Sequence, residues 1–270
     1  SLMVNLKKKY AQLDPVWDRL RNEAEDAVIA EPGIGGFIHT NILQHSSFEN
    51  ALAHRVTVKL ASAEISEQNL RDICSKAISN DPQVANAARA DVMAVVDRDP
   101  ACNRYMQPLL YFKGFLAVQA YRVSNWLWNN SQRDMAYFFQ MRTSEVFGID
   151  IHPAAKIGKG LMIDHAHSIV IGETSVVGDN VSMLHSVTLG GTGKEDEDRH
   201  PKIGDGVLIG AGAKVLGNIK VGSCCRIAAG SVVLQNIPPK KTVAGVPAKI
   251  VGEAGCSTPS IKMDQILSSD

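Results

Sequence analysis

Residues 203–233, which read IGDGVLIGAGAKVLGNIKVGSCCRIAAGSVV, decide the fold of this chain. An aliphatic residue stands at every sixth position of the stretch without a break: Ile203, Ile209, Val215, Val221, Ile227 and Val233. A period of six fits neither the 3.6-residue repeat of a helix nor the two-residue alternation of one long strand. Each hexapeptide therefore forms one short strand and its turn, which predicts a parallel β-helix. Ordinary glycine-rich hairpins are the alternative, and the unbroken period disfavours them.

The same register continues on the N-terminal side of this stretch. It holds over residues 151–163, slips by two residues, and resumes over residues 171–189 before a long insertion interrupts it. The register residues there are Ile151, Ile157, Ile163, Ile171, Val177, Met183 and Leu189. Eight of the thirteen register residues are followed by Gly or Ala, as tight corners with little room for a Cβ require. Three hexapeptides to a coil then give about four and a half coils.

Composition excludes several classes of partner. The chain has 270 residues, with 28 Lys and Arg against 28 Asp and Glu, so its formal charge is zero. A chain without net charge has no overall electrostatic attraction to nucleic acid or to anionic lipid, and we expect neither as a partner. The most apolar region, residues 109–128, is interrupted by Lys113, Gln119, Arg122 and Asn125, and no basic-then-apolar run is present. We therefore predict neither a membrane span nor a signal peptide.

The cysteines indicate the compartment. The five of them, Cys74, Cys102, Cys224, Cys225 and Cys256, form no CxxC pair. An odd count without such a pair fits free thiols in a reducing compartment better than a disulfide framework. We therefore predict a cytoplasmic protein.

The chain divides into three segments by pattern. Residues 3–148 are predicted as an α-helical domain, residues 149–251 as the β-helix domain, and residues 252–270 as a Ser-rich tail that is extended and flexible. Capping residues and helical spacing predict helices beginning at Pro15, at a capping box of Ser46 and Glu49, around residues 70–78, after Asp81-Pro82, over about 108–128 and over about 134–147. The fold class is therefore α+β, with helices and strands segregated along the chain.

A β-helix of this length also predicts an oligomer. Such a prism has open ends and flat faces that repeat down its axis. We expect the helical domain to cover one end, and the flat faces favour packing of identical chains side by side around a threefold axis. A homo-oligomer is therefore expected before any function is considered.

Polar residues inside the apolar repeat identify the candidate site, because the turns of a scaffold need neither histidines nor paired acids. They gather in residues 150–153 (DIHP), in residues 164–167 (DHAH) and in the insertion of residues 190–201. Asp150 precedes a register residue and His165 follows one by two positions, so we expect the two to approach each other across successive corners of one coil. An aspartate that holds one ring nitrogen of a histidine leaves the other free as a base for a hydroxyl.

Other interpretations of these residues stay open at this point. Asp150 also suits the closure of the preceding helix, and His165 or His167 suits a hydrogen-bonded surface position. His185 suits a turn position. Zinc bound between chains by His165, His185 and His200 is a further alternative.

The insertion has two interpretations as well. Residues 190–194, GGTGK, superficially resemble a phosphate loop, but they lack the GxxxxGK[ST] order and no helix follows them. A long loop that leaves a rigid coil is better explained as a lid over a substrate site. Arg199 then offers a planar fork of donors suited to a carboxylate.

Several short runs together carry a resemblance. They are DIHPAAKIG at 150–158, DHA at 164–166, VTLGGTGK at 187–194, DRHPK at 198–202 and GVPAK at 245–249. In the helical half, DP at 99–100 stands ahead of PLLYFKGF at 108–115. Over nearly the whole chain, these runs resemble the serine O-acetyltransferase family of hexapeptide-repeat acyltransferases.

What the resemblance implies begins with the fold and the reaction. It implies a left-handed β-helix, a hexamer built from two trimers, and transfer of an acetyl group from acetyl-CoA to L-serine in cysteine biosynthesis, with no metal. It also implies feedback inhibition by L-cysteine. Three rival hypotheses remain, which are acetyl transfer to another hydroxyl acceptor, such as homoserine or a sugar, a zinc carbonic anhydrase of the same repeat fold, and a non-catalytic scaffold.

The resemblance also implies roles for individual residues. Those that act on serine are His165 as general base with Asp150 to orient it, Asp99 and Asp164 on the ammonium, and Arg199 and His200 on the carboxylate. Those that face acetyl-CoA are Gly191, Thr192, Ala211 and Ala229 along the pantetheine arm, and Lys249, with Lys214 second, at the phosphates.

The C-terminal residues concern a further partner. Members of the family often end in an isoleucine that enters the next enzyme of cysteine synthesis, O-acetylserine sulfhydrylase. This chain ends LSSD at residues 267–270. We therefore expect weak or absent binding of the sulfhydrylase.

Overall fold

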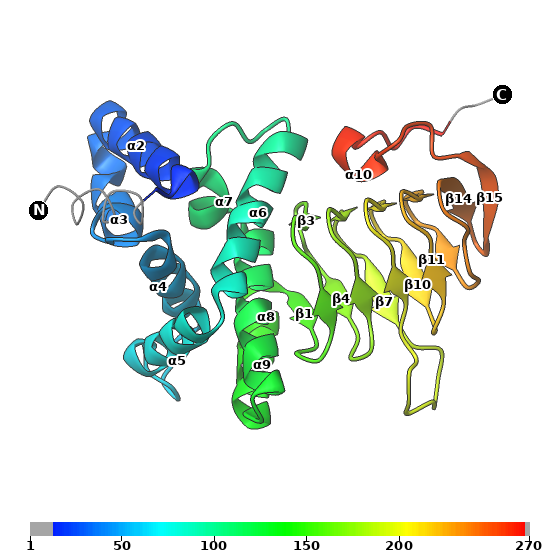
Figure 1. The fold of residues 1–270 in the computed structure, drawn as a ribbon, viewed down its shortest axis with the longest axis horizontal. Helices are drawn as coiled ribbons and strands as arrows, with labels where there is room; N and C mark the ends of the chain where they lie inside the picture. Colours follow the sequence, from blue (N-terminus) through cyan, green and yellow to red (C-terminus); the bar gives the residue numbers. More distant parts are fainter. Residues whose placement is uncertain (1–12, 268–270) are drawn as a thin grey trace, which may run out of the picture.

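The computed structural model describes residues 13–267. The helices of the N-terminal half gather at one end of an elongated molecule, and the β-helix extends from them to the other end (Figure 1). Within residues 13–267, no helix combines the length and the apolar character that a bilayer span needs.

The helical half is a series of helices joined by short turns. Their bounds are α2 (Pro15–Ala30), η1 (Pro32–Ile34), α3 (Gly35–Ile38), η2 (His39–Leu43), α4 (Phe48–Leu60), α5 (Glu67–Asn80), α6 (Pro82–Arg98), α7 (Met106–Tyr111), α8 (Lys113–Asn129) and α9 (Arg133–Phe147). Asp14 caps α2 by accepting the Trp17 N–H at 3.2 Å. Gly148 ends α9 in the left-handed conformation, at φ 69°. Both ends lie where the sequence predicts them.

One predicted cap is displaced by a residue. Ser47, rather than Ser46, accepts the backbone N–H of Asn50 at 3.2 Å, so α4 begins at Phe48. The Ser46 hydroxyl instead accepts from the side-chain amide of Asn50 at 3.0 Å. Adjacent serines offer the same cap, and residue type alone does not choose between them.

The single helix predicted over residues 108–128 is wrong, because the structure has two helices there. Phe112, between α7 and α8, has extended backbone with φ −106° and ψ 106°. The Arg55 guanidinium, reaching over from α4, donates to the carbonyls of Leu109 at 3.1 Å and Leu110 at 2.6 Å. The buried guanidinium takes the place of the backbone N–H groups that a further helical turn would offer to these carbonyls. The chain changes direction at Phe112.

The second half of the chain winds as a parallel β-helix with three sheets, named A, B and C here. Sheet A contains β1 (Ile149–Ile151), β4 (Ile169–Ile171), β7 (Thr188–Gly190), β10 (Lys214–Leu216) and β13 (Val232–Val233). Sheet B contains β2 (Lys156–Ile157), β5 (Val176–Val177), β8 (Lys202–Ile203) and β11 (Lys220–Val221). Sheet C contains β3 (Met162–Ile163), β6 (Ser182–Met183), β9 (Leu208–Ile209), β12 (Arg226–Ile227), β14 (Lys241–Gly245) and the antiparallel β15 (Ala248–Glu253). The predicted β-helix is confirmed.

The residues of the six-residue register stack inside the prism. Ile151 pairs with Ile171, Ile171 with Leu189, and Leu189 with Val215, and all four are buried. The two-residue slip falls in the turn between β3 and β4, and the insertion leaves the coil between β7 and β8. Breaks in the period are therefore the longer turns.

Two edges of the prism organise the candidate site. At the CA edge the chain passes from sheet C to sheet A through residues 164–168, 184–187, 210–213 and 228–231. At the AB edge it passes from sheet A to sheet B through residues 152–155, 172–175, 191–201 and 217–219. The width of sheet A separates the two edges.

A buried ion pair joins the helices to the first coil. The Asp91 carboxylate of α6 lies 2.8 Å from Arg122 Nη2 of α8, and their side chains are 2% and 7% exposed. Asp91 also accepts the Leu161 N–H and the Gln119 amide, each at 2.9 Å. Arg122 donates to the Gly158 carbonyl at 2.9 Å. Both helices are thus fastened to the backbone of the coil.

Residues 252–264 are held by strand pairing and by contacts with the coil, unlike the extended, flexible tail expected over residues 252–270, of which residues 268–270 lie outside the described part of the chain. β15 pairs with β14, and α10 (Pro259–Lys262) packs against α6 and sheet C. The Ser182 hydroxyl donates to the Ser260 carbonyl at 2.8 Å, and Arg226 donates to the Asp264 carbonyl at 3.1 Å. These partners are 78 and 38 residues apart in sequence, so the composition of the tail does not reveal them.

Candidate active site

Three of the predicted site residues lie in one cavity. Asp99, just after α6, and Asp164 and His165, just after β3, line a cavity of about 310 Å³. Phe112 and Met162 contribute apolar walls. The turn at Phe112 brings residues 111–115 to this cavity. Two carboxylates that face one small cavity favour a cationic group beside an imidazole.

His165 stands at a strained corner of the CA edge. Its φ is 59° and that of Ala166 is 66°, in the left-handed region that costs non-glycine residues about 1 kcal/mol or more each. The His165 side chain is 66% exposed, and its Nε2 lies 3.6 Å from Asp164 Oδ2. The His185 ring lies edge-on to it, with centroids 6.0 Å apart. The corner thus presents an imidazole to incoming molecules, which suits proton transfer.

The CA edge continues beyond His165 through His185 to two small residues. Strand pairing joins Ile163, Met183, Ile209 and Ile227 in successive coils. The residues two positions later, His165, His185, Ala211 and Ala229, therefore follow one another along the edge. At about 4.8 Å per strand, Ala229 lies about 14 Å from His165. The line suits an extended ligand, and the exposed Lys249 lies beyond it on β15.

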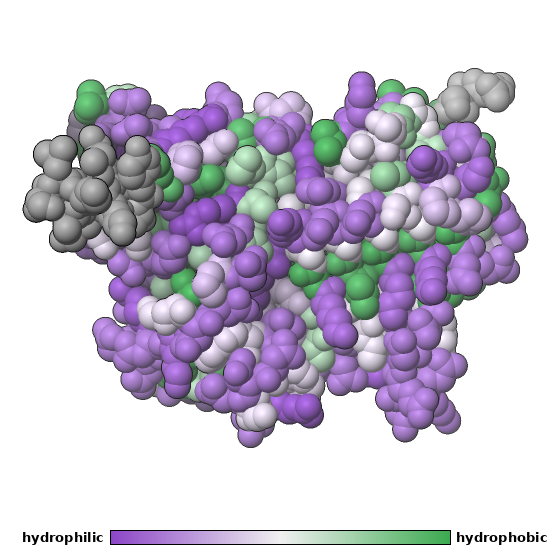
Figure 2. Space-filling view, viewed as in Figure 1, coloured by the Kyte–Doolittle hydropathy of each residue, from purple (hydrophilic) through white to green (hydrophobic). Residues whose placement is uncertain are grey.

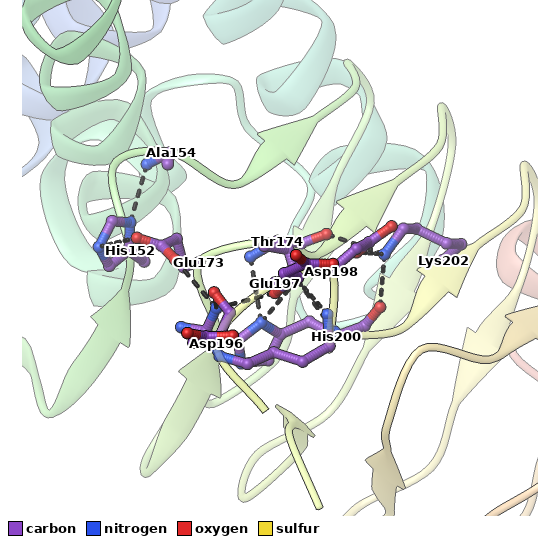
Figure 3. A network of polar contacts seen from close by, with 10 residues as sticks. His152, Ala154, Glu173, Thr174, Asp196, Glu197, Asp198, His200 and Lys202 are labelled. Carbon is purple, nitrogen blue, oxygen red and sulfur yellow. Dashed lines mark hydrogen bonds and ion pairs between the residues drawn. The ribbon is translucent and has the colours of Figure 1, made fainter. Parts of the chain in front are cut away.

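Arg199 and His200 lie at the AB edge, where the insertion returns to the coil. Figure 3 shows His200 there beside Thr174. The Thr174 hydroxyl accepts the backbone N–H groups of both residues, each at 3.0 Å. The Thr174 N–H donates to His200 Nδ1 at 3.1 Å. Nδ1 is therefore an acceptor, and Nε2 of His200 carries the ring proton.

The pair is suited to an anion. Burial lowers the pKa of His200, and the cations of Arg199 and Lys202 lower it further, so the ring is a neutral donor at neutral pH. Arg199 Nη1 donates to Glu173 Oε1 at 3.1 Å, while its Nε and Nη2 find no hydrogen-bond partner in the described part of the chain. Free donors of a guanidinium beside a neutral ring N–H match a carboxylate.

Of the residues predicted to face acetyl-CoA, some are free to contact a ligand and one is already engaged. Gly191 and Thr192 begin the insertion and are exposed. Lys249 is exposed as well. The Lys214 ammonium instead donates to the Ser186 carbonyl, so the residue ranked second for phosphates is already engaged within the coil.

Within one chain the two edges do not meet. Asp150 accepts from the Gln140 amide at 2.8 Å, whereas the acid beside His165 is Asp164. Within a single chain the structure shows no hydrogen bond or ion pair between Asp150 and His165, so the expected pairing across one coil is not seen there. His200 is likewise on the other edge from His165 and His185, and residues 13–267 contain no group of three side chains placed to hold a metal.

Sequence reasoning missed two residues of the site, Glu173 and Lys113. Glu173 follows register residue Ile171 by two positions, as Gly191 follows Leu189, so the same count would have placed Glu173 at the AB edge. Lys113 lines the cavity, and its Nζ lies 2.7 Å from His167 Nδ1. No periodic signal marks Lys113, because the break between α7 and α8 positions it.

Comparisons with known proteins place the chain in a family. Residues 16–120 match the sequence family described as serine acetyltransferase, N-terminal, and residues 200–235 match the bacterial transferase hexapeptide family. A serine acetyltransferase of Salmonella typhimurium is 51% identical over 254 residues, which are 94% of this chain and 93% of that protein. The chain belongs to the serine acetyltransferase family. The family resemblance seen in the sequence is confirmed.

Solved structures of serine acetyltransferases share the fold. That of Brucella abortus in complex with coenzyme A has a TM-score of 0.89 and 52% identity, and covers 92% of this chain and 99% of its own. A serine acetyltransferase in complex with cysteine gives 0.92 and 46%, over 94% and 99%. That of Neisseria gonorrhoeae in complex with serine gives 0.85 and 49%, over 88% and 98%. The left-handed β-helix that the resemblance implied is confirmed.

Proposed function

We propose that this chain transfers the acetyl group of acetyl-CoA to the hydroxyl of L-serine, giving O-acetyl-L-serine and CoA in cysteine biosynthesis. Identity of 51% to a serine acetyltransferase over nearly the full length carries the proposal. The test is release of the CoA thiol with L-serine, L-homoserine and a panel of sugars as acceptors. Release with homoserine or a sugar, and none with serine, would assign a different acceptor.

The cavity at the CA edge supports a binding mode for serine. Asp99 and Asp164 offer two carboxylates to the ammonium group, and the His165 imidazole lies in the same cavity. In the proposed reaction, His165 takes the hydroxyl proton as the serine oxygen attacks the thioester carbonyl. CoA leaves as the thiolate and receives the proton from the imidazolium, so no acyl-enzyme forms.

The carboxylate of the same serine needs a second copy of the chain. Arg199 and His200 lie across sheet A from His165, so one chain does not present all the groups to one molecule. We propose that the AB edge of one chain faces the CA edge of a neighbour around a threefold axis, where Asp150 also reaches His165, and that two trimers form a hexamer.

Subunit complementation tests this shared site. Coexpressed His165→Ala and Arg199→Ala chains should form mixed trimers with an unaltered site at some interfaces. At low serine concentration, the mixture should be more active than either variant alone. Equal activity of mixed and separate variants, in an oligomer confirmed by light scattering, would place both residues in one chain's site.

The CA edge also supports the binding of acetyl-CoA. Ala211 and Ala229 leave the edge uncrowded beyond His165, and Gly191 and Thr192 are exposed at the AB edge that would face it from the neighbouring chain. Lys249 would approach the phosphates. The acetyl-CoA thioester would then lie beside His165.

Arg199→Ala is expected to raise the apparent KM for serine about tenfold or more, with a smaller effect on kcat. The variant loses the donors proposed for the carboxylate in both the ground state and the transition state. Steady-state kinetics with serine varied at saturating acetyl-CoA measure it. A fall in kcat alone would contradict the role of Arg199.

We propose that L-cysteine inhibits by occupying the serine site. It differs from serine only in sulfur for oxygen. Asp99 and Asp164 would therefore bind its ammonium group, and Arg199 and His200 its carboxylate, as proposed for serine. Its thiol can also pair as thiolate with a protonated imidazole, which a serine hydroxyl cannot do at neutral pH. Serine should relieve the inhibition, and Arg199→Ala should weaken cysteine binding in calorimetry. Inhibition that serine does not relieve would indicate a separate site.

Two further expectations stay predictions from the sequence. The weak binding of O-acetylserine sulfhydrylase rests on the final residues, of which 268–270 lie outside the described part of the chain. The cytoplasmic location rests on the pattern of cysteines. Pull-down with the sulfhydrylase and cell fractionation would test them.

A further inference from the structure

Arg199 needs an anchor outside its own loop. The eight residues before it, 191–198, are all exposed, and the loop therefore offers little packing to fix a guanidinium. Its Nη1 donates to the Glu197 carbonyl of the loop at 3.0 Å and to Glu173 Oε1 at 3.1 Å. Glu173 differs from the loop carbonyl because it belongs to the coil, two residues after the end of β4.

Glu173 is itself held at its other oxygen. His152 Nδ1 accepts the Ala154 N–H at 3.0 Å, so the ring proton is on Nε2. Nε2 lies 3.6 Å from Glu173 Oε2, a polar contact longer than a hydrogen bond. Figure 3 shows His152 and Glu173 side by side, with Glu173 reaching from His152 toward the insertion.

The helices fix the His152 ring. Its centroid lies 5.0 Å from that of Trp128 in α8 and 5.8 Å from that of Tyr137 in α9, both edge-to-face. The Arg133 guanidinium lies over Trp128 at 4.3 Å. The series of contacts therefore runs from the helices through His152 and Glu173 to Arg199.

We propose that Glu173, backed by His152, is a positioning residue that aims Arg199 at the serine carboxylate. Glu173 engages Nη1 and leaves Nε and Nη2 for the ligand. Direct contact of Glu173 with the ligand is disfavoured, because its negative charge would repel a carboxylate. The inference rests on the proposed function and on the role of Arg199 in it.

Glu173→Gln tests the proposal with little change of shape. The serine KM should rise about five- to tenfold, as expected for loss of one charge-assisted hydrogen bond, while kcat and the KM for acetyl-CoA change less than about twofold. Glu197→Gln is the matched control. It removes the same charge two residues from Arg199 and keeps the loop carbonyl, so it should leave the serine KM unchanged. Equal rises in the two variants would overturn the proposal.

A double-mutant cycle separates positioning from general structural damage. In the Arg199→Ala background, Glu173→Gln should have less than about a twofold further effect on the serine KM, since it acts through the missing guanidinium. Additive effects would overturn the proposal. His152→Asn keeps an acceptor for the Ala154 N–H and removes Nε2, and should raise the serine KM about two- to threefold with the acetyl-CoA KM unchanged.

The unaltered chain distinguishes two kinds of failure. If it does not acetylate serine, the proposed function fails. If it does, and Arg199→Ala raises the serine KM while Glu173→Gln does not, only the positioning role of Glu173 is overturned.

Discussion

His165→Ala is expected to lower kcat for serine acetylation by about 10²-fold or more, with less effect on acetyl-CoA affinity. General-base catalysis contributes this much when the base stands within reach of the hydroxyl. His165 lies in the same cavity as both carboxylates proposed for the ammonium and is largely exposed there. Thiol release at saturating serine and acetyl-CoA measures kcat, and calorimetry with CoA measures affinity.

Two variants show whether the loss belongs to this imidazole. His167→Ala removes a histidine from the same corner without removing one from the cavity, and should stay within about threefold of the unaltered chain. Asp150→Asn should reduce kcat less than His165→Ala, because it changes the orientation of the base and leaves the base present. Near-full activity of His165→Ala would refute the assignment and make His185, edge-on to it, the next candidate.

The parts of the fold that the sequence predicted are those set by local pattern. The six-residue period gave the register of the coils, and Asp14, Asp81 and Gly148 marked helix ends by capping chemistry. What failed depended on distant partners. Arg55, over 50 residues away, ends α7 by binding its carbonyls. Contacts with Ser182 hold the C-terminal segment in the same way.

The site was predictable to a smaller extent. Polar exceptions to the repeat identified His165 and Arg199, and the family resemblance added Asp99, which no spacing would connect with a corner of the coil. Which of these residues share one site was not predictable. The position of a residue in a coil determines the edge on which it lies, but it does not show whether another chain packs against that edge. Glu173 escaped notice because a single acid at a turn resembles ordinary surface.

The β-helix exposes apolar side chains on its surface. Figure 2 shows an apolar band running along the β-helix between hydrophilic regions. Val170 on sheet A is 40% exposed and Leu234, just after β13, is 47% exposed. Apolar area exposed on a rigid coil favours association of chains, which is consistent with a site completed by a neighbour.

Asp91→Ala is expected to destabilise the chain by about 3–5 kcal/mol, the largest effect on stability we predict. The carboxylate is 2% exposed and accepts from Arg122, Gln119 and the Leu161 N–H. Its removal leaves the Arg122 cation, 7% exposed, without its acid, and leaves two further donors unpaired at the joint between helices and coil. Urea unfolding at one fixed protein concentration measures the change, since association also stabilises an oligomer.

Glu145→Ala provides the comparison that identifies burial as the cause. It breaks the Arg142–Glu145 pair, whose contact of 2.7 Å is as short as that of the buried pair but whose acid is 53% exposed. Arg142 keeps its hydrogen bonds to the Leu60 and Ala61 carbonyls and loses only a partner that is exposed to water, so the loss should stay below about 1 kcal/mol. Similar losses for the two variants would mean that Arg122 reaches water once Asp91 is gone. In that case the helices and the β-helix would be held together by their shared apolar core rather than by this ion pair.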